Sequence, residues 1–199
     1  MSQAERSQAT RARLLEAAYE LFAARGYAAV GTEEIVRAAG VTRGALYHHF
    51  ADKRQLFEAV YEDLERGLVE RLAQAALAAA SDDPLEALKA GTSAFLEDCE
   101  DPAVQQIAVL DAPSVLGWER WRAIGMKYAF GLVQGALQEA VDAGEIAPQP
   151  VEPIAHLLLG ASHEGAMLVA RAKDDGATRR QVADSIGRFL DSLRPGDTT

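Results

Sequence analysis

Few side chains in this 199-residue sequence have the types and spacing that catalysis or metal binding requires. Cys99 is its one cysteine, and no local motif places a histidine beside it to activate the thiol. His156 and His163 are separated by about 10.5 Å along a helix, too far for an easy chelating pair. With Glu164, we expect them to contact a ligand or a partner subunit instead. The sequence therefore predicts no catalytic residue, no metal site and no cofactor.

A second candidate site is the segment from Asp111 to Arg122, which combines both tryptophans with charged residues and a proline–glycine break. Trp118 and Trp121 are three positions apart, so they share one face of a helix. We expect them to line an apolar pocket closed by polar groups, suited to a small hydrophobic molecule. The alternative is that these aromatic side chains simply pack in the core. The residues predicted to line the pocket are Phe95, Asp111, Trp118, Trp121, Met126, Tyr128, Phe130 and His163.

A third group of polar side chains lies within residues 32–50, TEEIVRAAGVTRGALYHHF. Two short helical patterns are joined there by Ala39-Gly40-Val41. This spacing is typical of a helix-turn-helix, in which glycine permits the tight turn and the second helix enters the DNA major groove. Arg43 can pair with guanine through two hydrogen bonds, and Tyr47 can donate to a phosphate. The segment therefore predicts DNA binding.

The elements that must position these groups are all predicted to be helices. Apolar residues recur at helical spacing along the chain, whereas alternating patterns are scarce. We expect Thr32, Thr42 and Thr178 to cap the helices that follow them. In the first half of the chain, the expected helices cover residues 7–25, a short stretch after Thr32, 42–50 and 53–80. Another begins at Asp83-Pro84, and the next begins at Asp101-Pro102 and ends at Pro113. The last three cover residues 118–143, 154–171 and 178–193.

The net charge of −10 argues against a DNA-binding protein until it is divided along the chain. Residues 1–54 contain eight basic and six acidic residues, whereas residues 55–199 contain 12 and 24. Because local charge steers association with DNA, the N-terminal part remains compatible with DNA binding. The lone cysteine fits a reducing compartment, and charges interrupt every apolar stretch before membrane-spanning length. We therefore expect a cytoplasmic protein that does not cross a membrane.

Residues 32–60 resemble the DNA-binding signature of the tetracycline-repressor (TetR/AcrR) family of transcriptional regulators. The preceding helix extends the resemblance to residues 11–60. Gly31 departs from the pattern, because family members often have a second threonine there. The residues that carry the resemblance are Thr32, Ile35, Ala39-Gly40-Val41, Gly44, Leu46-Tyr47, His49-Phe50, Lys53 and Leu56.

The resemblance implies a role for each polar residue of this signature. The residues expected to bind the DNA backbone are Thr32, Thr42, Tyr47, His49 and Lys53. Those expected to face the bases are Arg43, Ala45 and His48, and Gly44 completes the DNA-binding set. The resemblance also implies a homodimer formed through residues 154–171 and 178–193. Small residues there would let two helices approach closely: Gly160, Ala161, Gly165 and Ala166.

We therefore predict an all-α protein with a three-helix DNA-binding head at residues 1–52. A ligand-binding and dimerisation body follows at residues 53–195. The protein would bind a palindromic operator, repress transcription and be released from DNA by a small hydrophobic effector. Two alternatives remain open: an all-α enzyme acting in the aromatic pocket, and a DNA-binding architectural protein without an effector.

Overall fold

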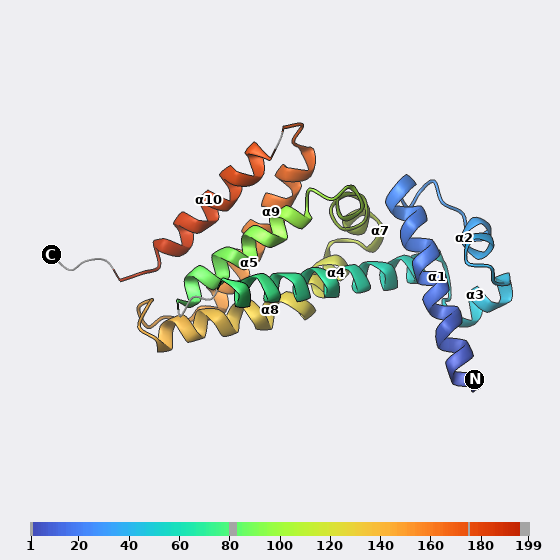
Figure 1. Cartoon of the computed structure of the whole chain (residues 1–199), viewed down its shortest axis with the longest axis horizontal. Helices are drawn as coiled ribbons and strands as arrows, with labels where there is room; N and C mark the ends of the chain where they lie inside the picture. The colour runs from blue at the N-terminus through green and yellow to red at the C-terminus, as the bar shows by residue number, and fades with distance from the viewer. Residues whose placement is uncertain (1, 80–82, 175, 196–199) are drawn as a thin grey trace. The chain divides into compact units, whose positions relative to one another are not determined.

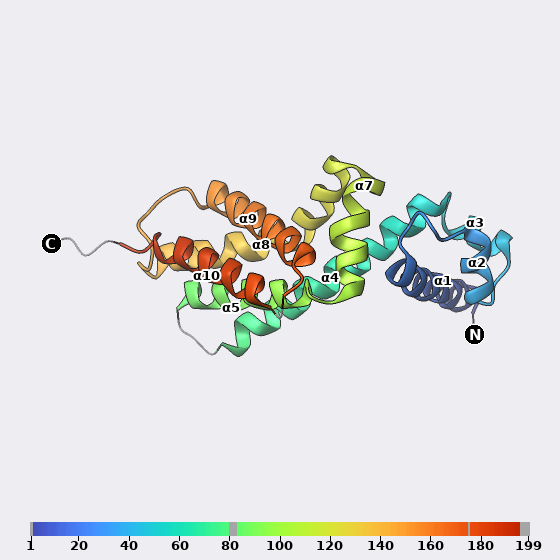
Figure 2. The same ribbon diagram turned by 90° about the horizontal axis from the view of Figure 1, so that it is seen from above.

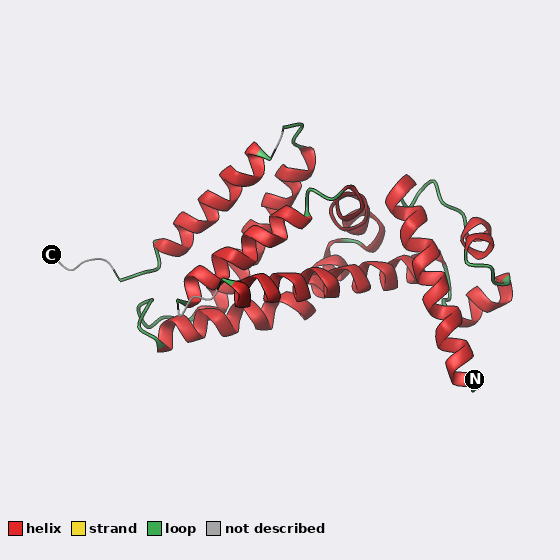
Figure 3. Cartoon of the chain, viewed as in Figure 1, coloured by secondary structure: helices red, strands yellow, loops and turns green. Residues whose placement is uncertain are grey.

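The computed structural model describes residues 2–79, 83–174 and 176–195, and every regular element in these ranges is a helix (Figures 1 and 3). The all-α fold predicted from the sequence is thereby confirmed. The helices are α1 (Gln3–Arg25), α2 (Thr32–Ala38), α3 (Arg43–His49), α4 (Lys53–Ala78), α5 (Pro84–Asp98), α6 (Pro102–Val104), η1 (Gln105–Asp111), α7 (Ala112–Leu116), α8 (Trp118–Asp142), α9 (Val151–Arg171) and α10 (Ala177–Asp191).

These helices form two compact units. Unit 1 contains the described residues of 1–64 and 102–121, and unit 2 contains those of 65–101 and 122–199. The predicted boundary at residue 52 did not anticipate that a later segment, residues 102–121, packs with the N-terminal helices. None of the helices in the described part of the chain has the length and apolar composition needed to span a bilayer.

The core of unit 1 is built on the apolar face of α1. Leu14 and Phe22 are fully buried there, as are Ile35 of α2 and Leu46 of α3. The ring of Phe22 meets that of Phe57, near the start of α4, edge to face with centroids 5.3 Å apart. This shared core fixes the orientation of α2 and α3 against α1, and Figure 2 shows the three helices grouped together.

Two of the three predicted threonine caps are wrong. Thr42 does cap α3, because its hydroxyl accepts the backbone N–H three residues later at 3.2 Å. Gly31, however, is the residue before α2, so Thr32 already has helical backbone and no side chain caps that helix. At α10, the carboxylate of Asp174 accepts the N–H and the hydroxyl of Thr178. A carboxylate is the stronger acceptor, and it reaches the helix from the preceding loop.

Helical structure also continues past Pro113, where the sequence predicted an end. Residues 105–111 form the wide turn η1, in which the N–H of Ala112 reaches back five residues to the carbonyl of Ile107. Pro113 then lies in the first turn of α7, where no intrahelical N–H donor is required. The helix ends instead at Gly117, whose φ of +80° suits a residue without a Cβ.

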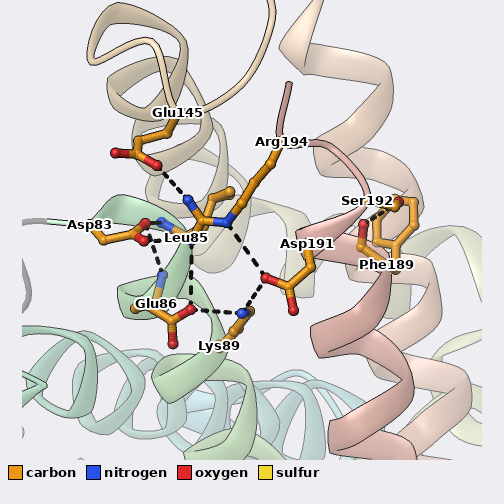
Figure 4. Close-up of polar contacts among 9 residues, drawn as sticks. All are labelled: Asp83, Leu85, Glu86, Lys89, Glu145, Phe189, Asp191, Ser192 and Arg194. Atoms are coloured by element: carbon orange, nitrogen blue, oxygen red, sulfur yellow. Dashed lines mark hydrogen bonds and ion pairs between the residues drawn. The ribbon is translucent and has the colours of Figure 1, made fainter. Parts of the chain in front are cut away.

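In unit 2 an ion-pair cluster fastens the C-terminal end of α10 (Figure 4). Arg194 donates to Asp83 at 2.5 Å and to Glu145, while Lys89 donates to Asp191 at 2.5 Å. Burial tends to raise the pKa of Asp83, but hydrogen bonds from Arg194 and two backbone N–H groups lower it below its ordinary value. The cluster therefore joins α10 to the start of α5 and to the connection between α8 and α9.

Helix α9 buries two of the small residues that were expected at a dimer interface. Gly165 and Ala166 are buried inside the protomer, and a Cβ on Gly165 would lie 2.6 Å from Val182 Cγ1 of α10. Gly165 thus serves the packing of α10 on α9 within the protomer. Between Ile154 and Ala170, the residues that α9 leaves exposed are Leu157, Ala161, Glu164 and Leu168. Their spacing of four, three and four places them on one face of the helix.

Candidate functional site

The turn between α2 and α3 is held from α1. Gly40 has a φ of +60°, a conformation that favours glycine. The guanidinium of Arg13 donates to the carbonyl of Ala39, at 3.0 and 2.7 Å, and to that of Gly40, at 2.5 Å. Sequence analysis missed this role, because nothing in the local sequence distinguishes Arg13 from Arg11. The helix-turn-helix geometry therefore depends on a side chain from outside the motif.

The outer face of α3 is polar and open to solvent. Arg43, Tyr47 and His48 are exposed, whereas Leu46 between them is buried. The Arg43 guanidinium lies over the Tyr47 ring, 5.5 Å from its centroid, and 3.7 Å from a carboxylate oxygen of Glu33. Because these exposed contacts are weak, they leave the arginine able to reach a base edge.

The other residues expected at the interface are closer to the protein body. Thr32, Ala45 and His49 are half-buried, while Gly44 is exposed. Burial, and then the positive charges of His48 and Arg11, lower the pKa of His49, which keeps its imidazole neutral at pH 7. A neutral imidazole still has one N–H with which to donate.

Lys53 closes the loop between α1 and α2. Its ammonium donates to the carbonyls of Tyr27, at 2.9 Å, and Val30, at 3.0 Å, and lies 3.9 Å from the centroid of the Tyr27 ring. The sequence predicted a DNA-backbone contact for this residue. The ammonium has three donors, so these two bonds leave one for a phosphate. Lys53 therefore stabilises the loop in unit 1 and is also a candidate DNA contact.

Asp111, Trp118 and Trp121, three of the residues predicted to line an effector pocket, belong to unit 1. The carboxylate of Asp111 accepts the backbone N–H of Tyr27 at 2.7 Å. The tryptophan rings are in contact, with centroids 5.1 Å apart, but Trp118 is 63% exposed and Trp121 only 6%. Asp111 and Trp121 therefore support the packing of unit 1, whereas Trp118 lies largely in solvent.

A cavity lies in unit 2, among α4, α5, α8 and α9. Its free volume is about 40 Å³, and part of the cavity is open to solvent. Of the eight residues predicted to line a pocket, Phe95 and His163 line this one, with ring centroids 6.5 Å apart. Most of the remaining lining is aliphatic, including Leu68, Leu72, Val133 and Leu158. The cavity thus offers a small, mostly apolar site with a few polar groups.

The polar groups of the cavity are Glu65, Thr92, Ser162 and His163. A Cβ on Gly125 would lie 3.5 Å from His163 Nε2 and 4.0 Å from a carboxylate oxygen of Glu65, so both groups adjoin this glycine. Burial, and then the charge of Arg122, lowers the pKa of His163 to about 4. At pH 7 the imidazole is therefore neutral and presents one donor and one acceptor.

Met126, Tyr128 and Phe130, the other residues predicted for the pocket, are not among those that line this cavity. On α8 the lining residues are Gly125, Ala129 and Val133, which recur every four positions and share one face. Because the three predicted residues lie off that face, they are half-buried elsewhere; the Phe130 ring, for example, stacks 4.8 Å from that of His156.

Sequence analysis also missed Glu65, although a signal for it was present. Tyr61, Leu68 and Leu72 of α4 have the spacing of one apolar face, and Glu65 interrupts it with a charge. The residue is 8% exposed. A carboxylate at a position that the helical period assigns to the core indicates a polar site inside the protein.

Cys99 does not have the chemistry of a nucleophile. Burial, and then the negative charges of Glu65 and Asp98, raises the pKa of its thiol to about 12. The thiol is therefore protonated at physiological pH, whereas nucleophilic attack requires the thiolate.

The comparison with known proteins decides the family. A model of the tetR family of bacterial regulatory proteins matches residues 14–60, and a model of the tetracyclin repressor-like C-terminal domain matches residues 85–193, more than half of the chain. The chain belongs to the TetR family. The resemblance inferred from residues 11–60 is confirmed, and the match extends through most of the remaining chain.

Individual relatives match the chain over different shares of its length. A crystal structure of a TetR-family transcriptional regulator from Pectobacterium atrosepticum has a TM-score of 0.83 and 30% identity, with 98% of each chain covered. The Transposon Tn10 TetC protein of Escherichia coli is 26% identical over 94% of this chain and 90% of its own. The HTH-type transcriptional regulator AcrR of Shigella flexneri is 42% identical over 33% of this chain and 31% of its own. The predicted ligand-responsive DNA-binding regulator is thereby confirmed at the level of the family.

Arg13→Ala should loosen the TetR-family head. The substitution removes the donors to the Ala39 and Gly40 carbonyls, so we expect the free energy of unfolding to fall by about 1 kcal/mol. DNA affinity should fall together with it, on cognate and scrambled duplexes alike. Urea denaturation and binding titrations measure the two effects, and Gln8→Ala, an exposed change on the same helix, should leave both unchanged. Wild-type stability in Arg13→Ala would contradict the role assigned to this arginine.

Proposed function

We propose that this TetR-family protein binds operator DNA as a homodimer and releases it when a small, mostly apolar effector enters the cavity of unit 2. The observation that carries the proposal is that one chain has both an exposed polar recognition helix and a buried apolar cavity with a polar end. A cavity of this kind favours an effector-dependent regulator over an architectural protein. The protonated Cys99 thiol argues against covalent catalysis by that residue. Since chromosomal DNA is the target, the protein acts in the cytoplasm.

In the head, residues 1–52, α3 reads the major groove and its flanking groups hold the DNA backbone. Arg43 reads a base, because its guanidinium is exposed at the first turn of α3 and can bond both acceptors of guanine. Ala45 and His48 face the neighbouring bases. The backbone contacts come from Thr32, Thr42, Tyr47, His49 and Lys53, and Gly44 allows close approach.

Arg43→Ala should relax sequence preference. A bidentate contact to guanine contributes about 1–3 kcal/mol of discrimination, so affinity for the cognate operator should fall by that amount while affinity for a scrambled duplex changes little. Titrations of both duplexes at one salt concentration make the comparison. Tyr47→Phe is the control, since loss of a phosphate contact weakens both duplexes equally. An equal loss on both duplexes for Arg43→Ala would show that this residue does not read a base.

In the body, residues 53–195, the effector occupies the cavity with a hydrogen-bond donor, such as a hydroxyl or an amine, toward Glu65. Two proteins of similar fold were crystallised with such molecules. RolR was crystallised with resorcinol (TM-score 0.74, 22% identity, covering 94% of this chain and 90% of RolR). FadR of Bacillus subtilis was crystallised with stearoyl-CoA (TM-score 0.73, 19% identity, covering 92% and 98%). Both ligands combine apolar surface with polar groups, as the lining here requires.

The signal passes along α4, because this one helix carries Lys53 of the head and cavity residues such as Leu68. An effector can shift the equilibrium only if it binds the DNA-free state more tightly than the DNA-bound state. Operator DNA must then weaken effector binding by the same factor. Occupied operators would be repressed, and effector binding would restore transcription.

Gly125→Ala should block the cavity without harming the head. A methyl there has room in the empty protein, 3.5 Å from His163 Nε2, but it takes space beside the polar groups. We expect operator affinity to be unchanged and binding of the neutral fluorescent probe N-phenyl-1-naphthylamine to fall several-fold. Gly131→Ala is the matched control on the same helix, because a Cβ there has no neighbour within 4 Å. Equal probe binding by both variants would place the ligand elsewhere.

Dimerisation uses α9 and α10, within residues 154–171 and 178–193. The exposed apolar side chains of α9, Leu157 and Leu168, lie on one face with the small Ala161 between them. A monomer would leave this face in water, whereas a symmetric pair of α9 helices would bury it.

Leu157→Asp should split the dimer, because a buried interface would then contain an unpaired carboxylate. Leu157 is 64% exposed in the single chain, so the change should not disturb the protomer fold. Sedimentation velocity should show a monomer, and affinity for the full palindrome should fall with it. Leu77→Asp, at an 81% exposed leucine of α4, is the matched control and should remain dimeric. A dimeric Leu157→Asp protein would rule out this face.

A further inference from the structure

An open groove runs between the first turns of α1 and helix α3, the two helices that Figure 1 shows side by side near the N-terminus. Helix α3 contributes Ala45, His48 and His49. The residues that α1 contributes were absent from the DNA-binding set predicted from the sequence, and they are Gln3, Ala4, Arg6, Ser7 and Thr10. The groove is therefore a polar surface continuous with the recognition helix.

The three arginines in the first half of α1 have different surroundings. Arg13 is held by the carbonyls of the helix-turn-helix, and Arg11 lies over the Phe50 ring, 5.4 Å from its centroid. Arg6 is exposed and lines the groove. The guanidinium groups of Arg11 and Arg13 are thus engaged by the protein, whereas Arg6 lines the groove.

The charges around the groove favour an anion. Arg6 lies along one wall, and on the other the pKa of His49 is lowered by burial and then by the positive charges of His48 and Arg11. The nearest acid in sequence, Glu5, is directed to the helix end, where its carboxylate accepts the Ser2 N–H at 2.7 Å. The hydroxyl of Thr10 donates to the Arg6 carbonyl at 2.9 Å, so Arg6 and Ser7 are the better donors toward a ligand.

We infer that this groove holds the sugar–phosphate backbone of one DNA strand, with the Arg6 guanidinium on a phosphate and the Ser7 hydroxyl beside it. The inference rests on the proposed insertion of α3 into the major groove. That groove is about 12 Å wide, so a helix fills it and the surfaces flanking the helix face the phosphates. The surface between α1 and α3 is such a flank, since it shares His48 and His49 with the recognition helix.

The test is the salt dependence of DNA binding by the full-length protein. Each neutralised phosphate contributes about 0.9 to the slope of log K against log salt concentration. Arg6→Ala should make this slope shallower by about 0.9 and weaken cognate and scrambled duplexes by the same factor. Arg6→Lys should keep the wild-type slope, because the charge is retained. Lys173→Ala, which removes one positive charge from an exposed position of unit 2, should change neither slope nor affinity.

Ser7→Asp is a second variant that adds a negative charge to the groove. It should weaken both duplexes more than Ser7→Ala, with the difference shrinking as salt is raised. A wild-type slope in Arg6→Ala, or a loss confined to the cognate duplex, would overturn the phosphate assignment while leaving the proposed function intact. If the wild-type protein itself bound no operator, the proposed function would fail. Thermal unfolding at the wild-type temperature confirms that each variant is folded.

Discussion

Unit 1 depends on how the backbone of one loop, between α1 and α2, satisfies its hydrogen bonds. Gly26 and Val30 of this loop are buried, and buried backbone polar groups need hydrogen-bond partners. Two side chains from distant parts of the sequence supply them: Asp111 accepts the Tyr27 N–H, and Lys53 donates to the Tyr27 and Val30 carbonyls. The loop thereby joins α1, α4 and η1, and α2 begins at its end. The orientation of the DNA-reading surface follows from these few bonds.

The two ends of α4 lie in different surroundings, one closely packed and one beside a cavity. At its start, Lys53 and the rings around Phe57 belong to a rigid, well-packed core. Farther along, Glu65 interrupts the apolar face beside a space that the surrounding side chains do not fill. An unfilled, partly polar interior costs stability, and a ligand that enters it recovers part of that cost. A regulator needs one region that changes conformation when a ligand binds and another that keeps its structure and moves as a unit.

The parts of the structure that were predicted from sequence are those determined locally. The helix-turn-helix was identified because Gly40, the Thr42 cap and the buried Leu46 lie within ten residues and each has a local physical reason. The cavity was only half identified. Phe95 and His163 line the cavity of unit 2, whereas Trp118 and Trp121 belong to unit 1. The tryptophans were chosen for their chemical type, which does not reveal which side of a helix faces a distant segment. The hydrogen bond from Arg13 to the Ala39 carbonyl joins residues 26 positions apart, so no local sequence pattern indicates it.

The wide turn η1 changes the directions in which side chains project from its helix. In an α-helix of 3.6 residues per turn, side chains five positions apart project in different directions. Bonds that span five residues bring such side chains nearly into line. Gln106 and Asp111 are so spaced, and both approach Gly26, where a Cβ would lie 2.9 Å from Gln106 Nε2 and 3.5 Å from the Asp111 carboxylate. One additional residue in a single turn is thus what lets two side chains reach the same loop, and glycine is the residue that leaves room for both.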